Sequence, residues 1–297
     1  MTIELFDDEM FEDEPAPPER PPREPRKRRR RGPSGETARR VLVALPWIVF
    51  AIAIVVAGGV VFAAAMVGLG VVALREFAAM ARRYRPIVLP AYVAVAALIS
   101  AAYLGTAFNV LYVLAASFAL LFAFAASAKY REGATVSMGV TLLAVVWIGV
   151  PLAHAVLLRE LPHHGAALLI DVLVGTFVTD TAAYATGRMF GSHKITPNLS
   201  PNKTIEGLVG GFLIGTMGFW FAGLYQDWLS GADALLIGAA VAAVAPIGDL
   251  FESMLKRDLG TKDTGTLFGP HGGLLDRLDA VLFTVVVGYY LSVALVY

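Results

Sequence analysis

The sequence predicts an all-α fold, a polytopic integral membrane protein with about nine transmembrane helices. Hydrophobic residues make up 57% of the 297 residues and charged residues only 16%, whereas an average soluble domain has about 25% charged residues. The charges are also concentrated at one end, because residues 1–40 hold 20 of the 48 charged residues. The rest of the chain therefore contains long, nearly uncharged segments, as expected of a chain that crosses a bilayer repeatedly.

The composition also excludes several classes of protein. The formal net charge is zero and the body of the chain has no basic face, so we expect no nucleic acid as a partner. The chain contains no cysteine, which excludes disulfides, thiolate metal sites and cysteine nucleophiles.

Residues 1–40 are predicted to form a disordered cytoplasmic tail. An acidic run is followed by a proline-rich stretch and then by a Lys/Arg-rich stretch from Arg20 to Arg31. Such a segment cannot bury enough apolar surface to fold. Its basic end, next to the first apolar span, marks the cytoplasmic side of the membrane.

The apolar spans divide into an N-terminal transmembrane region, residues 41–165, and a C-terminal transmembrane catalytic region, residues 166–297. Each span is near the roughly 20 residues that a bilayer crossing needs. The first two spans are nearly continuous, and only the Gly58–Gly59 pair separates them; one long helix there would reduce the count to eight. The spans cover residues 41–57, 59–75, 87–105, 107–128, 135–158, 166–187, 207–225, 234–255 and 278–297.

Basic residues indicate the orientation of these spans. With nine spans, the loops on the side of the N-terminus carry thirteen Lys or Arg residues, and the other loops carry only Arg159. Because cytoplasmic loops are enriched in Lys and Arg, we expect the N-terminus and the polar loops 188–206 and 256–277 to be cytoplasmic. The protein is predicted to be a multi-pass protein of the cell (inner or plasma) membrane.

The segment from Asp249 to Asp279 contains ten charged residues and His271. Ionisable groups at a membrane boundary are costly and usually functional. Residues Asp249, Glu252, Ser253 and Lys256 have helical spacing and share one helix face.

The carboxylates of this segment favour Mg²⁺, or Mn²⁺, over zinc, because they offer oxygen ligands and no cysteine accompanies them. Lys/Arg side chains supply positive charge that can bind a polyphosphate. Gly272 and Gly273 allow the backbone to approach phosphate oxygens closely. Carboxylates for a divalent metal combined with cations and glycines are the components of a phosphoryl- or nucleotidyl-transfer site.

A second polar block, residues 179–207, precedes the first. Asp180 lies inside an apolar span and needs a cationic partner, for which Arg188 on the same helix face or a metal ion would serve. Ser200, Lys203 and Thr204 can bind phosphate, or they can form a turn with a helix cap.

Both blocks resemble the sequence patterns of phosphatidate cytidylyltransferases, also called CDP-diacylglycerol synthases. The resemblance covers roughly residues 170–297, and one departure is Gly269–Pro270, where family members often have Pro-Gly. The upstream pattern is Asp180…Tyr184…Gly187-Arg188…Gly191…Ser200-Pro201-x-Lys203-Thr204-x-Glu206-Gly207, followed by Pro246-x-Gly248-Asp249-x-x-Glu252-Ser253. The downstream pattern is Ser253-x-x-Lys256-Arg257-x4-Lys262-Asp263-x-Gly265-x5-His271-Gly272-Gly273-x-x-Asp276-Arg277-x-Asp279.

The resemblance implies the reaction of CTP with phosphatidic acid to give CDP-diacylglycerol and pyrophosphate, with Mg²⁺ as cofactor, in phospholipid biosynthesis. The lipid phosphate is the nucleophile, so no protein nucleophile is needed, and catalysis is mainly positioning and charge neutralisation. The predicted partners are CTP, phosphatidic acid and membrane lipid, and a homodimer is left open.

We assign the following roles as hypotheses. The metal ligands are Asp249, Asp276 and one of Asp180 and Asp263. The catalytic cations are Lys256, Arg257, Lys262 and Arg277, and Arg188 and Lys203 bind the lipid phosphate. His271 shapes the phosphate loop, and the remaining substrate-binding residues are Ser200, Thr204, Glu252, Ser253, Gly272, Gly273 and Asp279.

Two alternatives use the same features differently. A CTP-dependent polyprenol or phytol-type lipid kinase would transfer the γ-phosphate to a lipid alcohol and release CDP. An ion-coupled transporter would bind an ion with its membrane-embedded charges, but transporter sites usually lie at the bilayer centre between internal repeats, and no repeat is visible.

Overall fold

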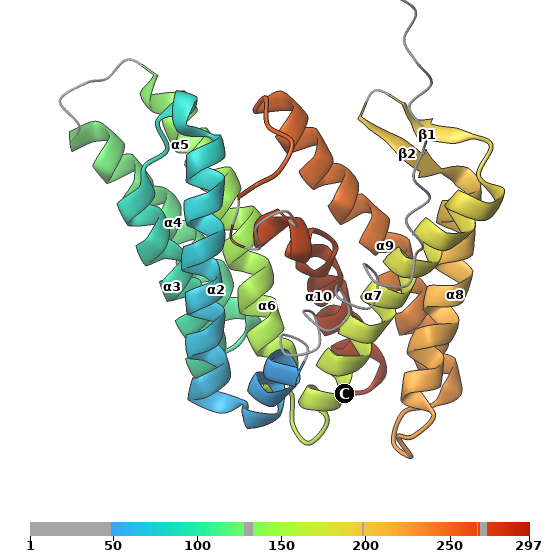
Figure 1. Ribbon diagram of the computed structural model, residues 1–297. Coiled ribbons are helices and arrows are strands. Elements are labelled where there is room, and N and C mark those ends of the chain that lie inside the picture. Colours follow the sequence, from blue (N-terminus) through green and yellow to red (C-terminus); the bar gives the residue numbers. More distant parts are fainter. Residues whose placement is uncertain (1–48, 128–132, 198, 266, 268–271) are drawn as a thin grey trace, which may run out of the picture. The chain divides into compact units, whose positions relative to one another are not determined.

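The computed structural model describes residues 49–127, 133–197, 199–265, 267 and 272–297. Residues Pro46–Tyr297 form one compact unit, and the predicted tail, residues 1–40, lies outside the described residues. The described parts of both predicted transmembrane regions belong to this unit. The assignment of catalysis to the region after residue 165 therefore stays a prediction. The elements are α2 (Gly59–Met80), α3 (Val88–Leu104), α4 (Ala107–Ser127), α5 (Ala134–Ala144), α6 (Val150–Arg159), α7 (Gly165–Phe190), β1 (Lys194–Thr196), β2 (Ser200–Thr204), α8 (Ile205–Gly223), α9 (Gly231–Asp258) and α10 (Leu275–Leu295) (Figure 1).

The all-α, polytopic membrane fold is confirmed, but the count of nine spans is not. Seven helices in the described part of the chain are long and apolar enough to cross a membrane. Helix α3 has only 17 residues. Of the first predicted span, residues 41–57, the structure describes only 49–57, and these are helical. Helices α5 and α6, joined by a π-helical turn at Val145–Gly149, together form one span.

The predicted break between the first two apolar spans occurs at Gly58 and Gly59. Both glycines have positive φ angles, 61° and 53°, which L-residues with side chains rarely adopt. Arg159 donates hydrogen bonds to the carbonyls of Val55 and Val56, at 2.5 and 3.1 Å. Glu160 accepts a hydrogen bond of 2.9 Å from the Gly59 amide. Two adjacent side chains thus satisfy backbone groups on both sides of the break.

Helices α7 and α8 pack closely because glycines of α8 face α7. A β-carbon at Gly211 would lie 2.7 Å from that of Ala183, and one at Gly215 would overlap the Thr179 hydroxyl. Such small-residue contacts let membrane helices approach without bulky side chains between them. This pair fixes the polar end of α7 beside the segment that leads into α8.

Helix α10 connects the two halves of the unit, since it packs against α2, α6, α7 and α9. Its contact with α9 is closest at Gly248, where a β-carbon would collide with the Asp279 carbonyl. A buried hydrogen bond of 2.8 Å joins the hydroxyls of Thr176 on α7 and Thr284 on α10. The polar ends of α7, α9 and α10 are thereby held near one another.

The polar loop 188–206 contains a small antiparallel hairpin, β1–β2, that we did not predict. Lys194 pairs with Thr204 and Thr196 with Ser200. The hairpin (Figure 1) carries Lys203, which contacts Asp249 of α9.

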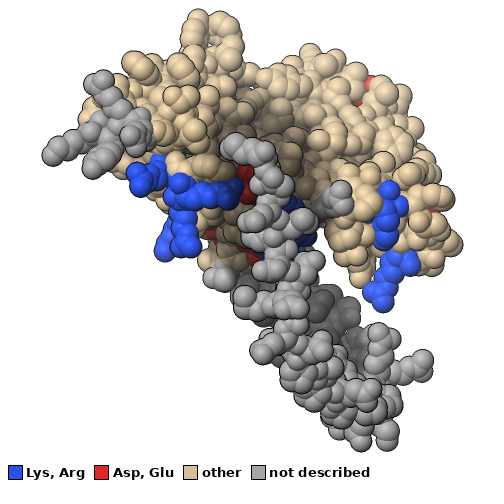
Figure 2. All heavy atoms as spheres, turned by 90° about the horizontal axis from the view of Figure 1, so that it is seen from above, with Lys and Arg blue, Asp and Glu red and all other residues tan. Residues whose placement is uncertain are grey.

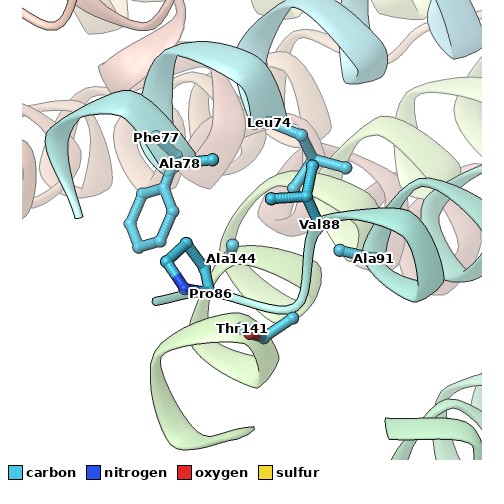
Figure 3. A pocket seen from close by; sticks show the side chains of 8 residues that line it. All are labelled: Leu74, Phe77, Ala78, Pro86, Val88, Ala91, Thr141 and Ala144. Atoms are coloured by element: carbon cyan, nitrogen blue, oxygen red, sulfur yellow. The ribbon is translucent and has the colours of Figure 1, made fainter. Parts of the chain in front are cut away.

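A small apolar hollow lies between α2, α3 and α5 (Figure 3). Phe77 and Leu74 of α2 line it together with Val88 of α3. Its polar residue, Thr141 of α5, accepts a hydrogen bond of 2.8 Å from the Ile87 amide, just before α3. The hollow contains no charged side chain, and it contributes to packing rather than to the polar site.

Candidate active site

Charged side chains gather on the face of the molecule where the β1–β2 hairpin lies, with acidic groups among the Lys and Arg residues (Figure 2). The predicted site residues come from separate elements on this side. Asp180 and Arg188 lie on α7, Lys203 on β2, Asp249 on α9 and Asp276 on α10. The tertiary structure therefore brings both polar blocks together.

Lys256 lies between two carboxylates. Its Nζ atom is 2.6 Å from Oε2 of Glu252, one turn earlier on α9, and 2.8 Å from Oδ1 of Asp276 on α10. The Glu252 side chain is only 1% exposed, and a buried carboxylate requires such a partner. Glu252 thus holds the lysine that joins α9 to α10, and its predicted role in binding substrate stays a prediction.

Asp276 is engaged through both of its oxygens. Oδ1 contacts Lys256, and Oδ2 accepts hydrogen bonds from the Thr264 amide (2.9 Å), the Thr264 hydroxyl (2.9 Å) and the Gly273 amide (2.8 Å). Gly272, with φ of 87°, has no room for a β-carbon, which would lie 2.5 Å from Oδ2 of Asp276. Asp276 thus organises the loop before α10.

A second ion pair joins the hairpin to α9. Nζ of Lys203 lies 2.6 Å from Oδ2 of Asp249, whose other oxygen is 3.5 Å from the Ser253 hydroxyl. Asp180 interacts electrostatically with both Asp249 and Lys203. Asp279 does so with Asp249 and Asp180. Carboxylates of α7, α9 and α10 are therefore electrostatically coupled, with Lys203 paired to Asp249 and Lys256 acting on Asp279.

Acidic groups outnumber basic ones in this network. Its five carboxylates are Asp180, Asp249, Glu252, Asp276 and Asp279. Within the described ranges, three of them form ion pairs: Asp249 with Lys203, and Glu252 and Asp276 with Lys256. Unbalanced negative charge at partly buried positions is costly, and oxygen donors are the ligands that Mg²⁺ prefers. The chemistry of this donor set therefore fits a divalent cation.

The carboxylates of this network are not arranged as a complete set of metal ligands. Among the residues that the structure describes, no group of three or more acidic or histidine side chains is placed to hold a metal ion. The predicted pair of ligands, Asp249 and Asp276, makes contacts with two different lysines. Asp263, the other predicted ligand, is exposed in the segment between α9 and α10.

The other predicted cations lie around this network and are exposed. Arg188 donates a hydrogen bond of 3.0 Å to the Tyr184 hydroxyl, one turn earlier on α7. Arg257 lies at the end of α9 and contacts the Leu199 carbonyl of the hairpin at 3.5 Å. Lys262 is exposed in the segment between α9 and α10, and Arg277 is exposed in the first turn of α10. These exposed side chains lie within reach of an anion from the aqueous side, whereas Lys203 and Lys256 are paired with carboxylates.

Of the remaining predicted residues, Thr204 and Ser200 belong to regular secondary structure, and His271 lies outside the described residues. Thr204 is buried and caps α8, accepting a hydrogen bond of 3.1 Å from the Gly207 amide, which is the alternative that the sequence left open. Ser200 begins β2. His271 lies outside the described residues, so its role remains a prediction.

The comparison with known proteins decides the family. The sequence pattern of the cytidylyltransferase family matches residues 38–295. The chain belongs to the cytidylyltransferase family.

Relatives within this cytidylyltransferase family carry more specific names. The phosphatidate cytidylyltransferase of Bacillus subtilis is 35% identical over 155 residues, which cover 52% of this chain and 58% of that protein. That of Thermotoga maritima is 43% identical over 131 residues, covering 42% and 48%. The Escherichia coli protein YnbB is 37% identical over 158 residues, covering 50% and 53%. The chain spans about half the length of the curated relatives it matches.

In this cytidylyltransferase family member, one buried carboxylate that the sequence did not point to contacts the segment next to the charged network. Glu76, near the end of α2, is buried and accepts hydrogen bonds from the backbone at the start of α10. A charged residue at the end of an apolar span was the available signal. It was missed because Glu76 lies almost 200 positions before its partners, a distance that no local spacing rule covers.

Proposed function

We propose that this protein is a phosphatidate cytidylyltransferase, which transfers the cytidylyl group of CTP to phosphatidic acid. One observation carries the proposal within the family. Carboxylates of α7, α9 and α10 meet two held lysines at the polar end of a membrane-embedded helix bundle, so a water-soluble triphosphate and a lipid headgroup can both reach them.

The proposed reaction needs no covalent enzyme intermediate. A phosphate oxygen of phosphatidic acid attacks the α-phosphorus of CTP, the bond from that phosphorus to the bridging oxygen breaks, and pyrophosphate leaves. Both substrates are anionic, so their approach requires positive charge placed in advance. Lys203 and Lys256 supply fixed positive charge, and the exposed Arg188, Arg257, Lys262 and Arg277 can close on the phosphates.

We propose Mg²⁺ as the cofactor and Asp180, Asp249 and Asp279 as the residues that would hold it. A bound divalent cation would neutralise triphosphate charge and polarise the phosphoryl group. Asp276, whose oxygens are all engaged, would orient Lys256 and the loop before α10. This assignment revises the predicted ligand set, in which Asp276 and Asp263 were included.

We further propose that the polar end faces the cytoplasm across the cell membrane, where CTP is available. The excess of Lys and Arg in the loops on this side supports that orientation. Homodimer formation stays a prediction, and cross-linking of the protein in its native membrane would test it.

The direct test is an assay of the full chain purified in detergent, supplied with Mg²⁺, labelled CTP and phosphatidic acid. We expect equal amounts of CDP-diacylglycerol and pyrophosphate, with little product from ATP, GTP or UTP. Diacylglycerol in place of phosphatidic acid, and chelation of the metal, serve as controls that should give no product. Release of CDP with a phosphorylated lipid alcohol would instead establish the lipid kinase, and no turnover with either acceptor would refute cytidylyl transfer.

A further inference from the structure

Glu76 is a buried carboxylate from the N-terminal half of the chain that contacts the start of α10. Its side chain lies near the end of α2, and the residue is 9% exposed. Oε1 accepts a hydrogen bond of 2.9 Å from the Leu274 amide, and Oε2 accepts one of 3.0 Å from the Leu275 amide. These amides belong to the unpaired N–H groups that every helix has at its N-terminus.

The charge of Glu76 is met by these amides and not by a cation. No Lys, Arg or His pairs with it in the portion of the chain that the structure describes. A carboxylate at a helix N-terminus is stabilised by the aligned peptide dipoles. Since the N-cap residue Leu274 makes no side-chain cap hydrogen bond, Glu76 caps the two amides at the start of α10 from another helix.

Thr264 links Glu76 to the ion-pair network. Its hydroxyl lies 3.2 Å from Oε2 of Glu76 and 2.9 Å from Oδ2 of Asp276. Asp276 in turn holds Lys256 through its other oxygen. One continuous set of contacts therefore runs from α2 through Thr264 to the lysine between α9 and α10.

Two glycines of the loop are explained by the same carboxylate. A β-carbon at Gly265 would lie 2.6 Å from Oε1 of Glu76, and one at Gly273 would lie 2.5 Å from Oε2. Both distances are too short for a carbon–oxygen contact, so the loop fits around Glu76 only with glycine at these positions.

We propose that Glu76 is a positioning residue of the active site, which fixes the start of α10 and, through Thr264, the orientation of Asp276 and Lys256. This inference rests on the proposed function for its kinetic consequences. Its structural consequence, protection of the α10 amides, does not depend on which reaction the site performs.

The test compares Glu76→Gln with a matched control, Glu160→Gln, in the full chain. Glu160 also accepts a hydrogen bond from a helix-start amide, that of Gly59, but it lies at the other end of α2. We expect Glu76→Gln to lower kcat for pyrophosphate release about tenfold, because misplaced charge weakens transition-state stabilisation more than binding, with KM for CTP changed less. Glu160→Gln should leave both constants near those of the unsubstituted protein.

A double-substitution cycle separates positioning from general destabilisation. Thr264→Val removes the linking hydroxyl, and the Glu76→Gln/Thr264→Val protein should lose no more activity than the more damaged single variant, since both act through one path. Losses that multiply, or Glu76→Gln values within about twofold of the unsubstituted protein, would overturn the proposal. If Glu76→Gln gives no folded protein, an unchanged kcat in Thr264→Val overturns it.

Hydrogen exchange followed by mass spectrometry distinguishes this proposal from the enzymatic one. Exchange at Leu274 and Leu275 should accelerate in Glu76→Gln, and the peptides around Gly59 should not change. Unchanged exchange at the start of α10 would refute the positioning role even in an active enzyme. Inactivity of the unsubstituted protein combined with accelerated exchange in the variant would refute only the proposed reaction.

Discussion

Polar side chains at the two ends of the helix bundle have different kinds of partners. At one end, Arg159 and Glu160 satisfy backbone groups beside Gly58, and buried Asp171 of α7 accepts a hydrogen bond of 2.7 Å from Gln226. Each of these groups has a nearby neutral or backbone partner. At the other end, Asp180, Asp249 and Asp279 interact electrostatically with one another, and of these three Asp249 is paired with Lys203.

This difference separates polar groups that stabilise the fold from those that can bind a ligand or take part in catalysis. Groups that are fully satisfied in the folded chain stabilise it, and a ligand would have to replace their partners. Clustered carboxylates repel one another, so the folded chain alone does not explain their placement. Carboxylates without enough cations are therefore the better candidates for function.

The largest effect on activity is expected from Asp249→Asn. Loss of this carboxylate removes a proposed metal ligand and the partner of Lys203, and kcat should fall at least ~100-fold. The control is Asp171→Asn, at the other end of the bundle, whose kcat should stay within about twofold. Assays of pyrophosphate release on both proteins make the comparison, and equal losses would remove the distinction between the two ends.

Gly58→Ala is expected to lower folding stability and to leave kcat unchanged. An alanine at a φ of 61°, with its β-carbon against the Arg159 guanidinium, should cost about 2 kcal/mol of folding stability. Thermal unfolding in detergent would measure the loss, and the protein that remains folded should keep its normal kcat. A selective loss of kcat without loss of stability would show that this end also takes part in catalysis.

A smaller effect on activity is expected from Lys203→Met. The hairpin keeps its strand pairing, but the fixed positive charge beside Asp249 is lost, and kcat/KM should fall about tenfold. Lys194→Met, on the paired strand, is the matched control because Lys194 is exposed and makes no ion pair within the described ranges. Similar losses in the two variants would indicate a general effect of charge at the membrane surface.

The smallest effect is expected from replacing Arg28–Arg31 with alanine. These residues lie in the predicted tail, and we expect turnover within about twofold of the unsubstituted protein, as for most surface changes away from a site. The same assay in lipid vesicles tests this, and a large loss would show that the tail contributes to activity.

The membrane helices could be predicted closely from the sequence. The expected spans 107–128 and 166–187 correspond to Ala107–Ser127 and Gly165–Phe190, because a long apolar segment in lipid must satisfy its backbone as a helix. The break at Gly58 was expected from the glycine pair. The number of spans was less certain, since the 17-residue α3 is near the lower limit for a crossing.

The gathering of these charged residues at one end of the bundle could be predicted, but the pairing among them could not. Asp249, Lys256 and Asp276 were each identified as site residues, whereas the structure shows Lys256 held by Glu252 and Asp276. Which lysine meets which carboxylate depends on distances between helices far apart in sequence. The β1–β2 hairpin was missed because its strands have three and five residues, too short for a reliable alternating pattern.

Hydrophobicity and local spacing, which are properties of neighbouring residues, suffice to predict that the chain crosses a bilayer as helices and that its ionisable residues lie near one end of them. The contact of Glu76 in α2 with the start of α10, and that of Lys203 with Asp249, become visible only in the folded chain. Those contacts depend on how closely the helices pack, and the packing depends on glycines and hydrogen bonds from segments separated by tens to hundreds of residues.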